Sequence, residues 1–162
     1  FDLTITVNGF SKAYAMTGWR LGYFAAPMAI AKAVNAFQSH STSGPNTFAQ
    51  FGAVEALRGP QDCVRDMVKA FAERQAYIYN RMTAIPGVTC VKPMGAFYVL
   101  PNISHFGLGS LQFAERLLEK EGVAVVPGLP FGSDKHVRLS YACGLDHIRE
   151  GLDRFERLCK SL

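Results

Sequence analysis

The 162-residue sequence predicts a mixed α/β fold, because short apolar segments of strand character alternate with longer segments of helical periodicity. Residues 3–7 alternate and are rich in β-branched side chains, which is typical of a strand, and residues 21–25 have a similar pattern. From Val64 to Met82, in contrast, apolar residues recur at helical spacing. We interpret that stripe as the core-packing face of a long helix and not as a cofactor site.

Glycine, proline and polar clusters separate the remaining elements. Pro27 suits the first turn of a helix that runs to about residue 40, and the polar residues 39–46 predict a loop or a crossing between domains. Ser110 is a candidate cap for a further helix, and Gly122 is placed to end it. The other expected elements, in chain order, are helices at about 47–57 and 64–82, strands at 88–91, 96–100 and 123–126, a turn-rich link at 127–132, a strand at 136–142 and a final helix at about 145–158. We therefore expect two pieces, residues 1–45 and residues 46–162.

Composition narrows the class of protein. With 49% hydrophobic and 19% charged residues, the chain can bury a core and has the charge content of an ordinary soluble protein. The net charge of +4 is spread along the chain without a basic run, so we predict no nucleic-acid partner. No apolar stretch reaches the length of a membrane span, and we expect neither a membrane partner nor a signal peptide. The cysteines show no CxxC spacing and form no metal-ligand cluster with the histidines, so we expect free thiols in a reducing cytoplasm and no metal site.

A lysine that could take part in covalent catalysis lies just after the first predicted strand. Lys12 follows Ser11, and Arg20 comes eight positions later in a segment interrupted by glycine. A positioned lysine amine can attack a carbonyl and hold it as a Schiff base. A guanidinium and a nearby hydroxyl are donors suited to a phosphate. The plainer interpretations are a solvated lysine, an ion pair for Arg20 and a local turn hydrogen bond for Ser11.

Arg138 is a second candidate. The strand period places Val137, Leu139 and Tyr141 on one face, and it leaves Arg138 on the other face beside small residues. Space around a guanidinium suits bidentate binding of a carboxylate. From the strand alone, an edge-strand arginine that faces water is an equally good interpretation.

Four segments resemble one known family. Residues 8–23 (NGFSKAYAMTGWRLGY) are similar to the cofactor-lysine segment of class I aminotransferases, which are fold type I pyridoxal-phosphate enzymes, and the bacterial aspartate aminotransferase branch is the nearest match. Residues 41–47 (STSGPNT), 93–99 (PMGAFYV) and 136–142 (HVRLSYA) support the resemblance in the same order along the chain. The resemblance extends from end to end of the sequence.

The resemblance implies roles for five residues. Lys12 would be the catalytic lysine that binds pyridoxal 5'-phosphate covalently, and Ser11 and Arg20 would bind the cofactor phosphate. Arg138 would bind the substrate α-carboxylate, and Phe97 would line the substrate pocket. The resemblance also implies that residues 1–45 end the large cofactor domain and that residues 46–162 form most of the small α/β C-terminal domain.

The lysine motif lies well past the midpoint of family members, so this chain resembles the C-terminal portion of an aminotransferase. The groups that contact the cofactor ring would then lie in an N-terminal part of the same polypeptide. The resemblance implies an enzyme of amino acid metabolism that transfers an amino group between an amino acid, aspartate or another, and a 2-oxo acid. It also implies a cytoplasmic homodimer, and we expect the fragment alone to be inactive.

Two alternatives stay open from the sequence. A carbon–sulfur β-lyase or an aromatic aminotransferase of the same fold would keep Lys12, Arg20 and Arg138. A non-catalytic aminotransferase-like domain of a transcription regulator is the other alternative.

Overall fold

The computed structural model describes residues 2–162, and their contacts divide the chain into two compact units. The first unit ends at Asp66 and the second is Met67–Leu162, so the division falls inside one helix, α3 (Asp62–Ala84). The predicted boundary at residue 45 concerns the domains of a longer protein, and it stays a prediction.

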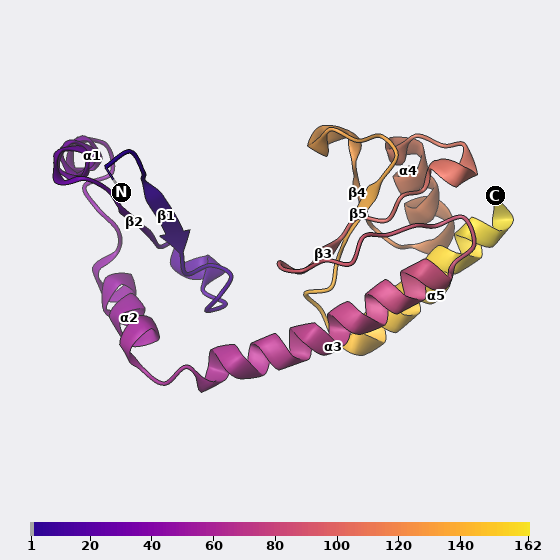
Figure 1. Ribbon diagram of the computed structural model, residues 1–162, viewed down its shortest axis with the longest axis horizontal. Coiled ribbons are helices and arrows are strands. Elements are labelled where there is room, and N and C mark those ends of the chain that lie inside the picture. Colours follow the sequence, from indigo (N-terminus) through magenta and orange to yellow (C-terminus); the bar gives the residue numbers. More distant parts are fainter. Residues whose placement is uncertain (1) are drawn as a thin grey trace. The chain divides into compact units, whose positions relative to one another are not determined.

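The first unit contains an antiparallel pair of strands, β1 (Thr6–Gly9) and β2 (Gly22–Ala25), followed by helices α1 (Met28–Ser41) and α2 (Thr47–Arg58) (Figure 1). The ladder runs from Thr6 opposite Ala25 to Gly9 opposite Gly22. The first strand therefore begins later than the predicted residues 3–7. Its partner strand ends at Ala25 and Pro27 is the N-cap of α1, so residues 3–5 have no strand to pair with in this hairpin.

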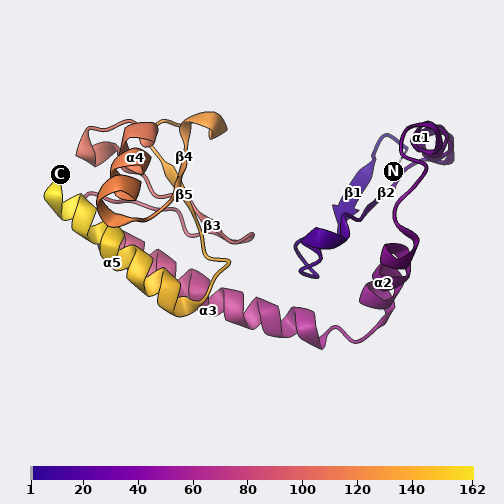
Figure 2. The same cartoon turned by 180° about the vertical axis from the view of Figure 1, so that it is seen from behind.

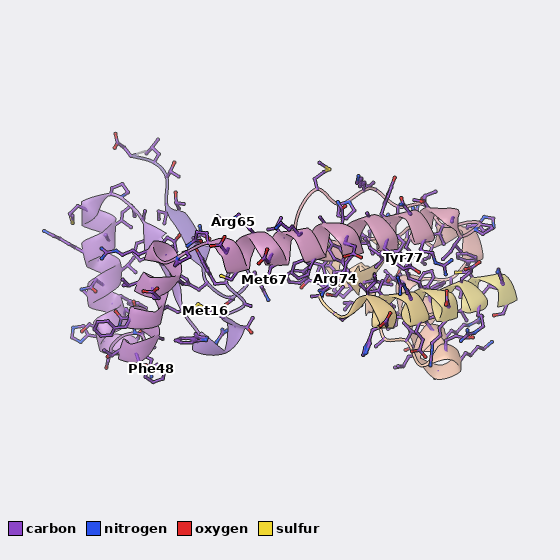
Figure 3. The ribbon with its side chains drawn as sticks, turned by 90° about the horizontal axis from the view of Figure 1, so that it is seen from below. Met16, Phe48, Arg65, Met67, Arg74 and Tyr77 are labelled. Carbon is purple, nitrogen blue, oxygen red and sulfur yellow. The ribbon has the colours of Figure 1, made fainter. Side chains whose placement is uncertain are left out.

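The packed core of the first unit is small. It consists of Phe10, Met16, Leu21, Ala49 and Ala53, and it lies under the loop that joins β1 to β2. Large apolar side chains of the helices lie outside it: Phe37 of α1 is 76% exposed, and Phe48 of α2, labelled in Figure 3, is 71% exposed. The β1–β2 loop is thus the part of this unit that is held most firmly by burial.

The second unit is a three-stranded antiparallel sheet covered by helices (Figures 1 and 2). The strand order is β3-β5-β4, with β5 (Val137–Ser140) between β3 (Tyr98–Val99) and β4 (Val126–Pro127). The helices are most of α3, α4 (Ser110–Glu121) and α5 (Leu145–Ser161), and the short 3₁₀ helices are η2 (Ser104–Phe106) and η3 (Leu129–Phe131). The helix predictions in this part of the sequence are confirmed.

A single apolar cluster holds the second unit together. Phe113 of α4 and Phe155 of α5 are completely buried, with their ring centroids 5.3 Å apart. The predicted apolar stripe of α5 supplies Ile148, Leu152, Phe155 and Leu158, all buried. Helix α5 lies along the C-terminal half of α3, where Arg81 forms ion pairs with Asp153 and Glu156. Tyr77 of α3, labelled in Figure 3, lies 5.6 Å from the Arg149 guanidinium of α5.

Two strand predictions in the second unit are wrong in detail. The strand predicted at 88–91 is reduced to an isolated bridge between Thr89 and Asn102, and the strand predicted at 123–126 is shifted to Val126–Pro127. Among the described residues, Thr89 pairs only with Asn102, which lies beyond the end of β3, and the segment at 126–127 pairs only with Arg138 and Val137 of β5.

Ser110 is not the cap of α4 but its first residue, and it is fully buried. The carboxylate of Asp134 performs the capping role: it accepts hydrogen bonds from the Ser110 backbone N–H at 2.8 Å and from the Ser110 hydroxyl at 2.7 Å. These two bonds hold the pKa of Asp134 below its usual value. At the other end, Gly122 adopts a φ of 66° and ends the helix as predicted.

Candidate functional site

The loop between β1 and β2 carries three of the predicted site residues, and Phe10 anchors it. The Phe10 backbone N–H donates to Leu21 O at 3.3 Å, and Phe10 O accepts from the N–H groups of Tyr14 and Met16 at 3.3 and 3.4 Å. The Phe10 ring is buried, and its centroid lies 5.7 Å from that of the Tyr14 ring and 5.4 Å from that of the Tyr23 ring. The chain is therefore fixed at the residue that precedes Ser11 and Lys12.

Ser11 and Lys12 form the first turn of this loop. Ser11 is half-buried and the Lys12 side chain is exposed, while Lys12 O accepts from the Ala15 N–H at 3.2 Å. Ala15 has a φ of 53°, in the left-handed region that few non-glycine residues adopt. The backbone that presents the Lys12 amine thus has a defined conformation set by its neighbours.

Arg20 ends the same loop. It follows the 3₁₀ helix η1 (Thr17–Trp19), has a φ of 53° and donates from Nη1 to Thr17 O at 2.9 Å. The hydrogen bond between Phe10 and Leu21 closes the loop, so Arg20 lies at the same end of the β1–β2 hairpin as Lys12. One loop therefore presents an amine, a hydroxyl and a guanidinium, a donor set that fits a group with both an aldehyde and a phosphate.

Arg138 lies on β5, the central strand of the second unit. Val137 and Tyr141 of the opposite face are buried, whereas Ser140 and Ala142 are exposed, so the predicted alternation is confirmed. The central carbon of the Arg138 guanidinium lies over the ring of Tyr98 at 4.5 Å and over the ring of Phe131 at 4.6 Å from their centroids. No hydrogen bond or ion pair from its guanidinium to another residue is found within residues 2–162.

Phe97 and Tyr98 have different neighbours, although their ring centroids lie only 4.6 Å apart. Tyr98 pairs with Ser140 and therefore shares the face of Arg138. Phe97 packs against the core cluster, with its ring centroid 6.0 Å from that of Phe71. The role of Phe97 in a substrate pocket stays a prediction.

Sequence reasoning overlooked Tyr98 and Phe131, the two rings over Arg138. Strand alternation places Tyr98 on the same face as Arg138, but only once the register of β3 against β5 is known. Phe131 lies in η3, where no periodicity marks it.

A hydrogen bond from the buried Tyr141 side chain fixes the segment before β3. Its hydroxyl donates to Ala96 O at 3.1 Å, its N–H donates to Phe97 O at 2.9 Å, and burial raises the pKa of its phenol. A depression of about 340 Å³ lies beside this segment, lined mainly by Phe71, Gln75, Met94 and Tyr141. None of the predicted site residues lines it.

Two features are absent from residues 2–162. No group of three or more histidine, cysteine, aspartate or glutamate residues there could hold a metal ion. No helix there combines the length and apolar character needed to cross a membrane.

Comparison with known proteins gives consistent matches. The family model "Aminotransferase class I and II" matches residues 2–155. An aspartate aminotransferase of Bacillus sp. (strain YM-2) is 47% identical over 97% of this chain and 41% of its own length. Among solved structures, an aromatic aminotransferase from Pyrococcus horikoshii OT3 has a TM-score of 0.94 at 42% identity, over 99% of this chain and 44% of the other. An aspartate aminotransferase from Rhizobium meliloti has a TM-score of 0.92 at 40% identity, over 97% and 42% respectively. The chain thus spans about two fifths of the length of the relatives that it matches.

Proposed function

The chain belongs to the family of class I and II aminotransferases, and we propose that the protein containing it transfers an amino group between an amino acid and a 2-oxo acid with pyridoxal 5'-phosphate as cofactor. The observation that carries this proposal is the β1–β2 loop, which presents Lys12, Ser11 and Arg20 from a backbone anchored by Phe10. The relatives described above are named as aminotransferases, so the β-lyase and regulator alternatives are not favoured.

Each predicted residue has one task in this proposal. Pyridoxal phosphate, when bound, supplies an electron sink for the electrons of the substrate Cα–H bond. The Lys12 amine holds the cofactor between reactions and carries the proton away from and back to the substrate during them. The Ser11 hydroxyl and the Arg20 guanidinium bind the cofactor phosphate. Arg138 binds the substrate α-carboxylate in the plane of its guanidinium.

The remaining expectations belong to the same proposal. The intact protein would be a homodimer whose N-terminal part completes the cofactor site. The four cysteines are free thiols, which supports a cytoplasmic location. Two of the relatives described above are named for aspartate and for aromatic amino acids, so both classes of amino donor are the first substrates to assay.

Substitution of Lys12 in the intact protein tests the proposal. We expect Lys12→Ala to lower turnover by at least about 10²–10⁴-fold, because the substitution removes the general base. Borohydride reduction and peptide mapping should find a phosphopyridoxyl adduct on Lys12 in the wild type and none at that position in the variant. Lys32→Ala, at an exposed position of α1, is the matched control and should behave as the wild type does. Full turnover by Lys12→Ala would exclude this function for the loop.

A further inference from the structure

The Arg138 guanidinium is flanked by aromatic rings from the two sides of its strand. Tyr98 belongs to β3, which pairs with one edge of β5, and Phe131 belongs to η3, which follows the strand β4 at the other edge. Both rings lie within 4.6 Å of the guanidinium carbon, a distance at which a cation is attracted to an aromatic face. The guanidinium carbon therefore lies over the faces of two rings that come from opposite edges of β5.

The ring of Phe131 is exposed, but its backbone is fixed. The N–H of Leu129 donates to the buried Ser110 hydroxyl at 3.1 Å, and Phe131 N donates to Gly128 O at 2.8 Å. A side chain at Gly128 could not be accommodated, since its Cβ would lie 2.3 Å from His136 O. Hydrogen bonds and close packing thus hold η3 in one position beside β5.

The N–H edges of Arg138 have a different environment. Within residues 2–162 no carboxylate or carbonyl accepts from them, although Arg138 is only half-exposed. A guanidinium is usually oriented by its acceptors, and here aromatic faces provide the orientation instead. A planar carboxylate binds a guanidinium through two parallel N–H···O bonds, and the N–H groups of Arg138 are not occupied by another acceptor within the described residues.

We propose that Tyr98 and Phe131 are positioning residues for the substrate: they hold the Arg138 guanidinium between their rings and leave its N–H groups available to an incoming α-carboxylate. The inference rests on the proposed function and deepens it. Each ring acts through Arg138, and neither performs chemistry. The loss of either ring should therefore weaken substrate binding and leave the chemical step unchanged.

The test uses the intact protein, with L-aspartate and L-phenylalanine as amino donors, and compares Tyr98→Leu, Tyr98→Phe and Phe131→Leu with the wild type. We expect each leucine variant to raise KM for the amino acid about tenfold, with kcat and the borohydride adduct at Lys12 unchanged. Tyr98→Phe keeps the ring and should keep the wild-type KM. Tyr77→Leu is the matched control, because it removes a tyrosine ring from a different arginine, Arg149, and should leave KM unchanged.

The outcomes separate the two proposals. A wild-type protein that neither transfers amino groups nor forms the adduct at Lys12 overturns the proposed function together with this inference. An active wild type whose Tyr98→Leu and Phe131→Leu variants keep the wild-type KM overturns the inference alone. Tyr98→Phe that is as impaired as Tyr98→Leu also overturns it, since the hydroxyl and not the ring would then matter. Phe131 is 55% exposed, so its substitution leaves the core intact and gives a result even if Tyr98→Leu fails to fold.

Discussion

Replacement of Arg138 by lysine would test the carboxylate-binding role while keeping the positive charge. Lysine is a point charge and cannot form two parallel hydrogen bonds to one carboxylate in the way that arginine does. The loss of one charge-assisted hydrogen bond corresponds to about 1.5–3 kcal/mol. The weaker attraction to the rings of Tyr98 and Phe131, both within 4.6 Å, adds about 0.5–1 kcal/mol.

The sum is about 2–4 kcal/mol, so we expect Arg138→Lys to lower kcat/KM for the amino donor by roughly 30- to 1,000-fold. The assay is steady-state kinetics of the intact protein with several donors, with cofactor attachment at Lys12 measured in parallel. Arg149→Lys is the matched control, since Arg149 also lies near a tyrosine ring but on helix α5. Wild-type kcat/KM in Arg138→Lys would refute the reasoning, because no bidentate contact could then exist at this position.

Substitutions at three further positions in the intact protein test the packing of the second unit. The Phe155 ring is fully buried, so Phe155→Ala should lower the free energy of unfolding by about 3–5 kcal/mol and Phe155→Leu by only about 1 kcal/mol. Thermal or denaturant unfolding measures both values, and equal losses in the two variants would contradict the packing described. Gly151→Ala should raise the free energy of unfolding by about 0.5–1 kcal/mol, because Gly151 lies inside α5 and no other atom lies close to the position of an added Cβ. A lower melting temperature for this variant would contradict that reasoning. Burial raises the pKa of Cys159 from its ordinary value of 9.0 to about 12, so the unfolded chain releases this proton at lower pH than the folded chain does. The stabilising contribution of Cys159 is therefore complete below about pH 9 and declines between pH 9 and 12. In unfolding experiments across this range, the free energy of unfolding of Cys159→Ala should fall less with pH than that of the wild type. The same pH dependence in both proteins would contradict this expectation.

Local signals in the sequence predicted most elements of the fold. Helical periodicity located α3 and α5, and Pro27 and Gly122 located a helix start and a helix end, because these features depend on neighbours a few positions apart. The short strands were predicted less well. Their extent depends on the partner strand: residues 3–5 are apolar and alternating, yet β2 ends too early to pair with them.

The cap of α4 shows a second limit. The sequence favours Ser110 as the cap, since serine is common at that position, but the Asp134 carboxylate 24 residues away binds the first N–H of the helix. No local pattern marks Asp134 for this role. Its contribution depends on the path of the loop between β4 and β5.

The sequence by itself determined the family, the α/β class, and the loop that carries Ser11, Lys12 and Arg20, because these depend on residue identity and spacing within short segments. It also placed Arg138 on the strand face opposite Val137 and Tyr141. Only the tertiary structure decided what surrounds Arg138. Tyr98 reaches it through the register of β3 against β5, and Phe131 through a loop fixed by Ser110. Both relations join residues far apart along the chain, so they depend on strand pairing and packing and not on local sequence.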